Sequence, residues 1–155
     1  MNETKEIQTF SHKQLAVSCF NKVWDLLDQE NRTFEEDEQM IHLSHSSFWH
    51  WGQVEEHTSQ NISIGYWQLA RVYAVVGQGE TALRYAQRCI DESEQANLAP
   101  FYIGYAYEAA ARAYAVLNQD EQAKAAKNTA FEFAEKVIIE DSKKQLVADL
   151  NNISY

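Results

Sequence analysis

A chain of 155 residues has the length of one domain, and we treat residues 1–155 as a single domain. Its 13 basic and 23 acidic residues give a formal charge of -10, which argues against an electrostatic fit to nucleic acid or to an anionic membrane. Apolar residues make up 45%, enough for a packed core, while one proline and five glycines are few for the many turns of an all-β protein. The composition therefore predicts an all-α fold.

The two cysteines and the N-terminal residues bear on the cellular compartment. Residues 1–9 are polar and mixed in charge, without the apolar stretch of a secretory signal, and no apolar run approaches the ~20 residues that span a membrane. Cys19 and Cys89 are too few for a disulfide framework or a four-thiolate zinc site, and both lie on apolar faces. We expect a cytoplasmic protein in which both thiols are buried and structural.

The first helical hairpin is predicted over residues 11–54. Apolar residues recur at three- and four-residue steps in residues 11–28, which is typical of an amphipathic helix. Thr33 followed by Glu36 matches a capping box, in which the hydroxyl and the carboxylate satisfy the first free amides of a new helix. The second helix should continue to about residue 54.

Two further hairpins are predicted over residues 62–96 and 101–140, followed by a short last helix. Gly77 can adopt the left-handed conformation that ends a helix, and Pro100 disfavours helix in the residue before it. The predicted helices are residues 62–76, 80–96, 101–117 and 121–140, with Asp141 capping a last helix over residues 141–153. In that last helix the apolar residues at i, i+4 and i+7 should cover the preceding hairpin; they are Leu146, Leu150 and Ile153.

An internal repeat is the strongest signal in the chain. Residues 70–82 and 111–123 are identical at eight of thirteen positions without a gap, at a constant offset of 41. Each copy covers the end of one helix, a short turn and the start of the next helix, so the repeated unit is a helical hairpin. The repeated small and aromatic residues are interpreted as packing contacts rather than functional residues: Ala70, Tyr73, Ala82, Ala111, Tyr114 and Ala123.

These residues resemble the tetratricopeptide repeat in a variant form. Its spaced positions are occupied in one copy by Tyr66, Leu69, Ala70, Tyr73, Gly77, Ala82, Leu83 and Cys89, and in the next by Tyr107, Ala110, Ala111, Tyr114, Asn118, Ala123 and Ala130. The repeat length of 41 exceeds the ~34 residues usual for the family. The resemblance implies a right-handed α-α superhelix of about three antiparallel hairpins with a C-terminal capping helix, residues 11–54 forming a hairpin without the motif.

The resemblance also implies a concave groove lined by the first helix of each hairpin. It places Arg71 and Arg112 on that face, together with Trp67, Tyr105 and Glu108. One interpretation is that the two guanidinium groups hold a carboxylate of a partner while the aromatic rings cover its apolar part. The other is that they form ion pairs between neighbouring hairpins, since Glu108 precedes Arg112 by the favourable four residues. Arg71 has Trp67 at that spacing instead, which leaves its head group freer to stack on the ring.

Histidines cluster in the second predicted helix. His42 and His45 lie one turn apart on one face, where two imidazoles can chelate a divalent metal, and His50 or His12 could supply a third ligand. The alternative is that His42 and His45 are partly buried and hydrogen-bonded between hairpins. No glutamate stands between them as the zinc-protease motif requires.

The chain contains no phosphate-binding loop, dinucleotide-binding turn, nucleophile elbow or Cys-x-x-Cys pair. We therefore assign no catalytic residue and no cofactor, and favour an interaction module that binds a peptide or protein segment in its groove. One alternative is a small metal-dependent or small-molecule-binding protein that uses His42 and His45. Another is a structural homo-oligomer, and a homodimer through the N-terminal hairpin is expected because that hairpin has no evident polar cap.

Overall fold

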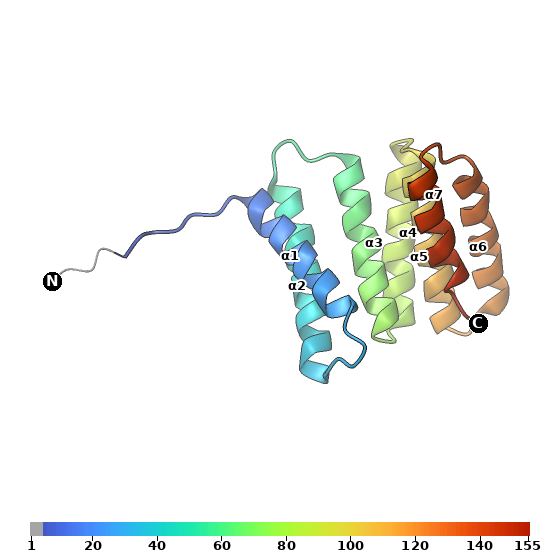
Figure 1. Ribbon diagram of the computed structural model, residues 1–155, viewed down its shortest axis with the longest axis horizontal. Helices are drawn as coiled ribbons and strands as arrows, with labels where there is room; N and C mark the ends of the chain where they lie inside the picture. The colour runs from blue at the N-terminus through green and yellow to red at the C-terminus, as the bar shows by residue number, and fades with distance from the viewer. Residues whose placement is uncertain (1–4) are drawn as a thin grey trace.

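Seven α-helices follow one another in the computed structural model, which describes residues 5–155, and those residues contain no strand (Figure 1). The all-α prediction is therefore confirmed for this part of the chain. The helices are α1 (His12–Leu27), α2 (Phe34–Gln53), α3 (Ser59–Val75), α4 (Gly79–Gln95), α5 (Pro100–Val116), α6 (Asp120–Glu135) and α7 (Glu140–Asn151).

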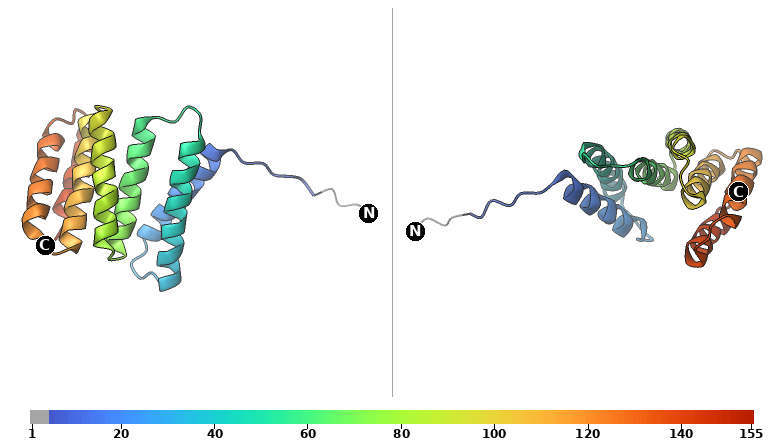
Figure 2. Two further views of the ribbon diagram at one scale, coloured as in Figure 1. Left: turned by 180° about the vertical axis from the view of Figure 1, so that it is seen from behind. Right: turned by 90° about the horizontal axis from the view of Figure 1, so that it is seen from above.

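Consecutive helices pack in pairs. α1 packs against α2, α3 against α4 and α5 against α6, while α7 packs against both α5 and α6. Because each connection reverses the chain, α1, α3, α5 and α7 run in one direction and α2, α4 and α6 return (Figure 1). Seen from above, α1 and α7 project to the same side of the molecule, on either side of α3 and α5 (Figure 2).

Side-chain caps fix where the early helices begin. The capping box of Thr33 and Glu36 is present as predicted, with the hydroxyl accepting from the Glu36 amide and the carboxylate accepting from the Thr33 amide. A second capping box, formed by Thr58 and Asn61, starts α3 three residues before the predicted start at residue 62. The polar residues Ser59, Gln60 and Asn61 therefore form the first turn of this helix.

The connection between α6 and α7 differs from the prediction. α6 ends at Glu135 rather than at residue 140, and the connection that follows is largely exposed: Ile138 is 96% and Ile139 67% exposed. Ile139 is the N-cap of α7 and makes no side-chain cap, while Asp141 lies in the first turn. The predicted cap at Asp141 is therefore wrong, although a carboxylate in the first turn still interacts favourably with the helix dipole.

The two copies of the sequence repeat form the same turn. Gly77 and Asn118 both have positive φ, +85° and +57°, in the left-handed region that glycine and asparagine tolerate best. The residues that follow, Gln78 and Gln119, have nearly identical backbone angles (φ -96° and -97°, ψ 73° in both). The main-chain N–H of each glutamine donates to the main-chain carbonyl five residues earlier, at 2.8 Å for Gln78 and 2.9 Å for Gln119.

The repeat interval extends beyond the residues that are identical. The first and last residues of α5 each lie 41 residues after those of α3, and the first residue of α6 lies 41 residues after that of α4. The start of α7 lies one residue short of that offset from the start of α5. α7 therefore occupies the position at which a further copy of the first helix of the hairpin would start.

Small residues allow the helices to approach closely. The four repeated alanines, Ala70, Ala82, Ala111 and Ala123, are at most 1% exposed. Gly104 of α5 lies so close to α7 that a Cβ atom there would be 2.7 Å from the Leu146 side chain. The last helix thus closes the apolar side of the α5–α6 pair, as the sequence predicts.

The ends of the described chain add two findings. Residues 5–10 extend away from the helices (Figure 1). Residues 1–9 were predicted not to form a secretory signal, and residues 1–4 of this stretch lie outside the described part of the chain. None of the helices in residues 5–155 combines the length and apolar character that a membrane crossing requires.

Deleting residues 141–155 should expose the apolar side of α5 and α6, so we expect a lower melting temperature or concentration-dependent association.

A milder change, Leu150→Ala, removes one fully buried side chain and should lower the free energy of unfolding by about 2–5 kcal/mol. The control is Lys144→Ala, at an exposed position of the same helix. Equal stability of Leu150→Ala and this control in urea titrations would contradict the assignment of α7 as a cap.

Candidate functional site

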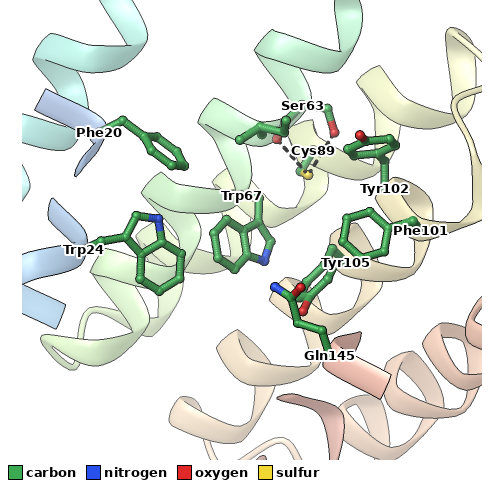
Figure 3. A pocket seen from close by; sticks show the side chains of 10 residues that line it. Phe20, Trp24, Ser63, Trp67, Cys89, Phe101, Tyr102, Tyr105 and Gln145 are labelled. Carbon is green, nitrogen blue, oxygen red and sulfur yellow. Dashed lines mark hydrogen bonds between the residues drawn. The ribbon is translucent and has the colours of Figure 1, made fainter. Parts of the chain in front are cut away.

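An aromatic hollow of about 400 Å³ lies between α1 and α7, with α3 and α5 forming its floor (Figure 3). Phe20 and Trp24 face it from the α1 side, and Phe101 and Tyr105 from the opposite side. The complete lining of this aromatic hollow is Phe20, Trp24, Ser63, Ile64, Trp67, Cys89, Phe101, Tyr102, Tyr105 and Gln145.

The hollow exists because α1 does not pack closely against α3. α3 packs directly against α5, whereas the N-terminal pair reaches α3 mainly through α2. Trp24 stacks on Trp67 with ring centroids 5.5 Å apart, and Gln68 Nε2 donates to the Phe20 carbonyl at 3.2 Å. Nearer the end of α1, Val23 and Leu26 share a buried apolar cluster with Val72 of α3. The space left beside these contacts is lined by aromatic rings.

The Cys89 thiol lies in the wall of the hollow, where burial favours its protonated form. Burial raises the pKa of Cys89 to about 12, although a hydrogen bond with Ser63 opposes the shift. Its Sγ donates to the Ser63 carbonyl at 3.3 Å. Cys89 is thus buried as predicted, whereas Cys19 is only half-buried. Since the thiolate is the reactive form, the wall offers non-covalent contacts.

A buried carboxylate, Glu108, connects the residues below the hollow. Its Oε1 accepts from Arg71 Nη2 at 2.9 Å and from Arg112 Nε and Nη2 at 2.9 and 2.6 Å. Its Oε2 accepts from the indole Nε1 of Trp67 at 3.0 Å. The Glu108 side chain is 0% exposed, so these donors replace the water that an ionised carboxylate would otherwise bind.

Glu108 is ionised at neutral pH. Burial by itself raises the pKa of this carboxyl group, but the positive charges of Arg71 and Arg112 and the hydrogen bond from Trp67 outweigh that effect. The net result is a pKa below its ordinary value of 4.5. The same ionic contacts join α3 to α5, so the charge also holds two helical pairs together.

Asp149 of α7 extends this network, and the sequence interpretation missed it. Its Oδ2 accepts from the Tyr105 hydroxyl at 2.6 Å, and its main-chain carbonyl accepts from Arg112 Nη2 at 3.4 Å. Burial, followed by the contact with Asp149, raises the pKa of Tyr105, which keeps the hydroxyl a donor. Asp149 lies at the repeat offset from Glu108, so applying that offset to α7 would have pointed to it.

The structure brings all five predicted groove residues, Trp67, Arg71, Tyr105, Glu108 and Arg112, into one connected set. Arg71 stacks on Trp67 as expected, with Cζ 5.1 Å from the ring centroid, but its head group also pairs with Glu108 of the next hairpin. The carboxylate that both arginines hold is thus the chain's own. Recognition of a partner's carboxylate stays a prediction.

The four histidines considered as metal ligands separate into two places. His42 is exposed, while His45 is half-buried and its Nε2 lies 2.7 Å from the Tyr73 hydroxyl. Burial, with a smaller effect of His42, lowers the pKa of His45. His12 and His50 instead contact each other, with their Nδ1 atoms 2.9 Å apart. Within residues 5–155 no group of three or more His, Cys, Asp or Glu side chains is placed to hold a metal ion.

Comparison with known proteins identifies no relative of this chain. No protein-family model matches it, and neither a curated protein nor a solved structure does. What the groove can bind must therefore be inferred from its own residues.

Replacing Glu108 with glutamine should strongly destabilise the protein, because Arg71 and Arg112 then lose their shared counter-charge. We expect a loss of about 3 kcal/mol in the free energy of unfolding, measured by urea titration. Glu121→Gln is the control, since the Glu121 side chain is 90% exposed and should change stability by less than ~0.5 kcal/mol.

The same variant should alter the response to acid. Since folding lowers the pKa of Glu108, its contribution is complete above the ordinary pKa of 4.5 and is lost as the pH falls toward the folded-state pKa. The wild type should therefore lose more stability than Glu108→Gln on acidification below this value. Parallel pH profiles for the two proteins would contradict the role assigned to this carboxylate.

Proposed function

We propose that this chain is a tetratricopeptide-like helical-hairpin protein that binds a peptide or protein segment in the groove between α1 and α7. The aromatic hollow is the observation that carries this proposal. Its volume of about 400 Å³ lies within the ~300–1,000 Å³ typical of ligand sites, and its lining is mainly aromatic. Large apolar side chains of a partner would lose contact with water on entering it.

Three features support the tetratricopeptide-like part of the proposal. Alternate helices run in the same direction, the repeat interval recurs from α3 to α7 to within one residue, and the turns after Val75 and Val116 share one conformation. Stacked hairpins of this kind wind into a superhelix, which we propose to be right-handed, with the first helix of each hairpin on the concave side.

The chemistry of the groove favours binding over catalysis. Glu108 already accepts four hydrogen bonds, and the Cys89 thiol has a raised pKa. Neither group is thus available as a base or a nucleophile at neutral pH. Tyr102 and Gln145 place polar side chains in the lining, where they can hydrogen-bond the backbone of a bound segment.

A peptide-display selection tests this function directly. Selected peptides should share a large apolar residue, and their affinity should fall at least about tenfold for Ile64→Glu, which places a charge on the apolar lining. The matched control is Phe34→Glu, the same kind of change at a residue that is 71% exposed and at the start of α2.

A melting curve of Ile64→Glu with the same shape as that of Phe34→Glu would show that Ile64→Glu is folded. If the selection enriches no apolar residue, or if both variants bind the selected peptides equally well, the groove is not the binding site.

A further inference from the structure

A second hollow, of about 250 Å³, lies at the other end of the same floor. It is formed where α3 and α5 end and where the chain leaves α7. We call this space the terminal hollow. Its lining consists of Ala74, Val75, Arg112, Ala115, Val116, Asn152, Ile153 and Ser154. A segment lying along α5 from the aromatic hollow would reach it.

Arg71 lies on α3 between residues of the two hollows, Arg112 lines the terminal hollow, and together they keep more donor capacity than the protein uses. Their side chains are 14% and 20% exposed, and both guanidinium groups share the single carboxylate of Glu108. The Nε–H of Arg71 is shielded from solvent and has no acceptor within residues 5–155. Buried donors are nearly always paired, so this unpaired donor shows that Glu108 does not satisfy all the donors of the two arginines.

Asp149 is the other carboxylate at this place, and it does not complete the cluster. Its Oδ2 is engaged by the Tyr105 hydroxyl, and Arg112 contacts its main-chain carbonyl instead. The described residues contain no ion pair between Asp149 and either arginine. The exposed edges of Arg71 and Arg112 therefore remain available to an anionic group that lies across them.

The helix geometry sets the spacing of the partner's side chains. Arg112 follows Tyr105 of the aromatic hollow by seven residues on α5, which is a distance of ~10 Å along the helix axis at ~1.5 Å per residue. An extended segment covers that distance in about three residues at ~3.3 Å each. Val116 in the terminal hollow is ~6 Å further along the helix, which corresponds to about two more residues.

We propose that the preferred partner is an extended segment with an acidic side chain between two apolar ones, spaced three and two residues apart. The first apolar side chain fills the aromatic hollow, the carboxylate lies across Arg71 and Arg112, and the second apolar side chain enters the terminal hollow. This inference rests on the proposed function, because it specifies what the same groove binds.

The test uses a synthetic, end-capped, fluorescently labelled decapeptide with Phe, Glu and Leu at this spacing in a Gly/Ser background. A second peptide carries the same residues in reverse order, since the floor does not fix the direction of the segment. Three derivatives each change one element: Glu to Gln, Leu to Ser, or Phe to Ser. Affinities for the full chain are measured by fluorescence anisotropy.

Replacing Glu with Gln in the better-binding peptide should weaken binding about tenfold, the size of a charge-assisted hydrogen bond. This change is made in the peptide, so folding of the protein is not affected. Because the chain carries a formal charge of -10, long-range attraction does not favour an acidic peptide, and a preference for Glu must come from local contacts.

Val75→Glu tests the terminal hollow from the side of the protein, since Val75 lines it and is 40% exposed. It should weaken binding of the Leu peptide but not of its Ser derivative, so the two changes should be non-additive. Phe34→Glu serves again as the control and should bind both peptides like the wild type.

The outcomes separate the two proposals. Equal affinity of the Glu and Gln peptides overturns the acidic preference, while a loss on changing Phe to Ser still supports a peptide-binding groove. Absence of any Phe-dependent binding overturns both. Self-association of the protein that excludes the labelled peptides also overturns both and assigns the groove to a second copy of the chain.

Discussion

The buried carboxylate of Glu108 is the constraint on which the arrangement of the C-terminal helices depends. A charge removed from water is unfavourable unless its oxygens are fully hydrogen-bonded, and here Trp67 and Arg71 from α3 and Arg112 from α5 supply the donors. These donors can converge only if α3 and α5 lie side by side. Small residues make that approach sterically feasible, since Ala70 and Ala111 are buried almost completely.

The N-terminal pair is attached differently, and that difference creates the groove. α1 and α2 lack the repeated motif, and no comparable ionic cluster in residues 5–155 joins α1 to α3. Instead, the stacking of Trp24 on Trp67 spans the gap and leaves an aromatic hollow beside it. The place where the repeat pattern stops is thus the place where the aromatic hollow lies.

The residues that stabilise the fold and those that line the two hollows overlap. Trp67 lines the aromatic hollow and also donates to Glu108, while Arg112 lines the terminal hollow and holds the same carboxylate. The ionic cluster therefore fixes the side chains of the floor, which would reduce the conformational entropy lost in the proposed binding of a peptide segment. Substitutions in the cluster will change folding and binding together, whereas Ile64 and Val75 line the hollows outside it.

The sequence by itself determined the all-α fold, the pairing of helices and the turns at Gly77 and Asn118, because these depend on local periodicity, capping and backbone preference. It also selected Arg71 and Arg112 through the repeat offset, and Glu108 because it precedes Arg112 by four residues on the same helix. Only the tertiary structure decided that the acceptor of both arginines is internal and that the space between α1 and α3 stays open. Those outcomes depend on distances between helices far apart in the chain, which no local pattern of residues encodes.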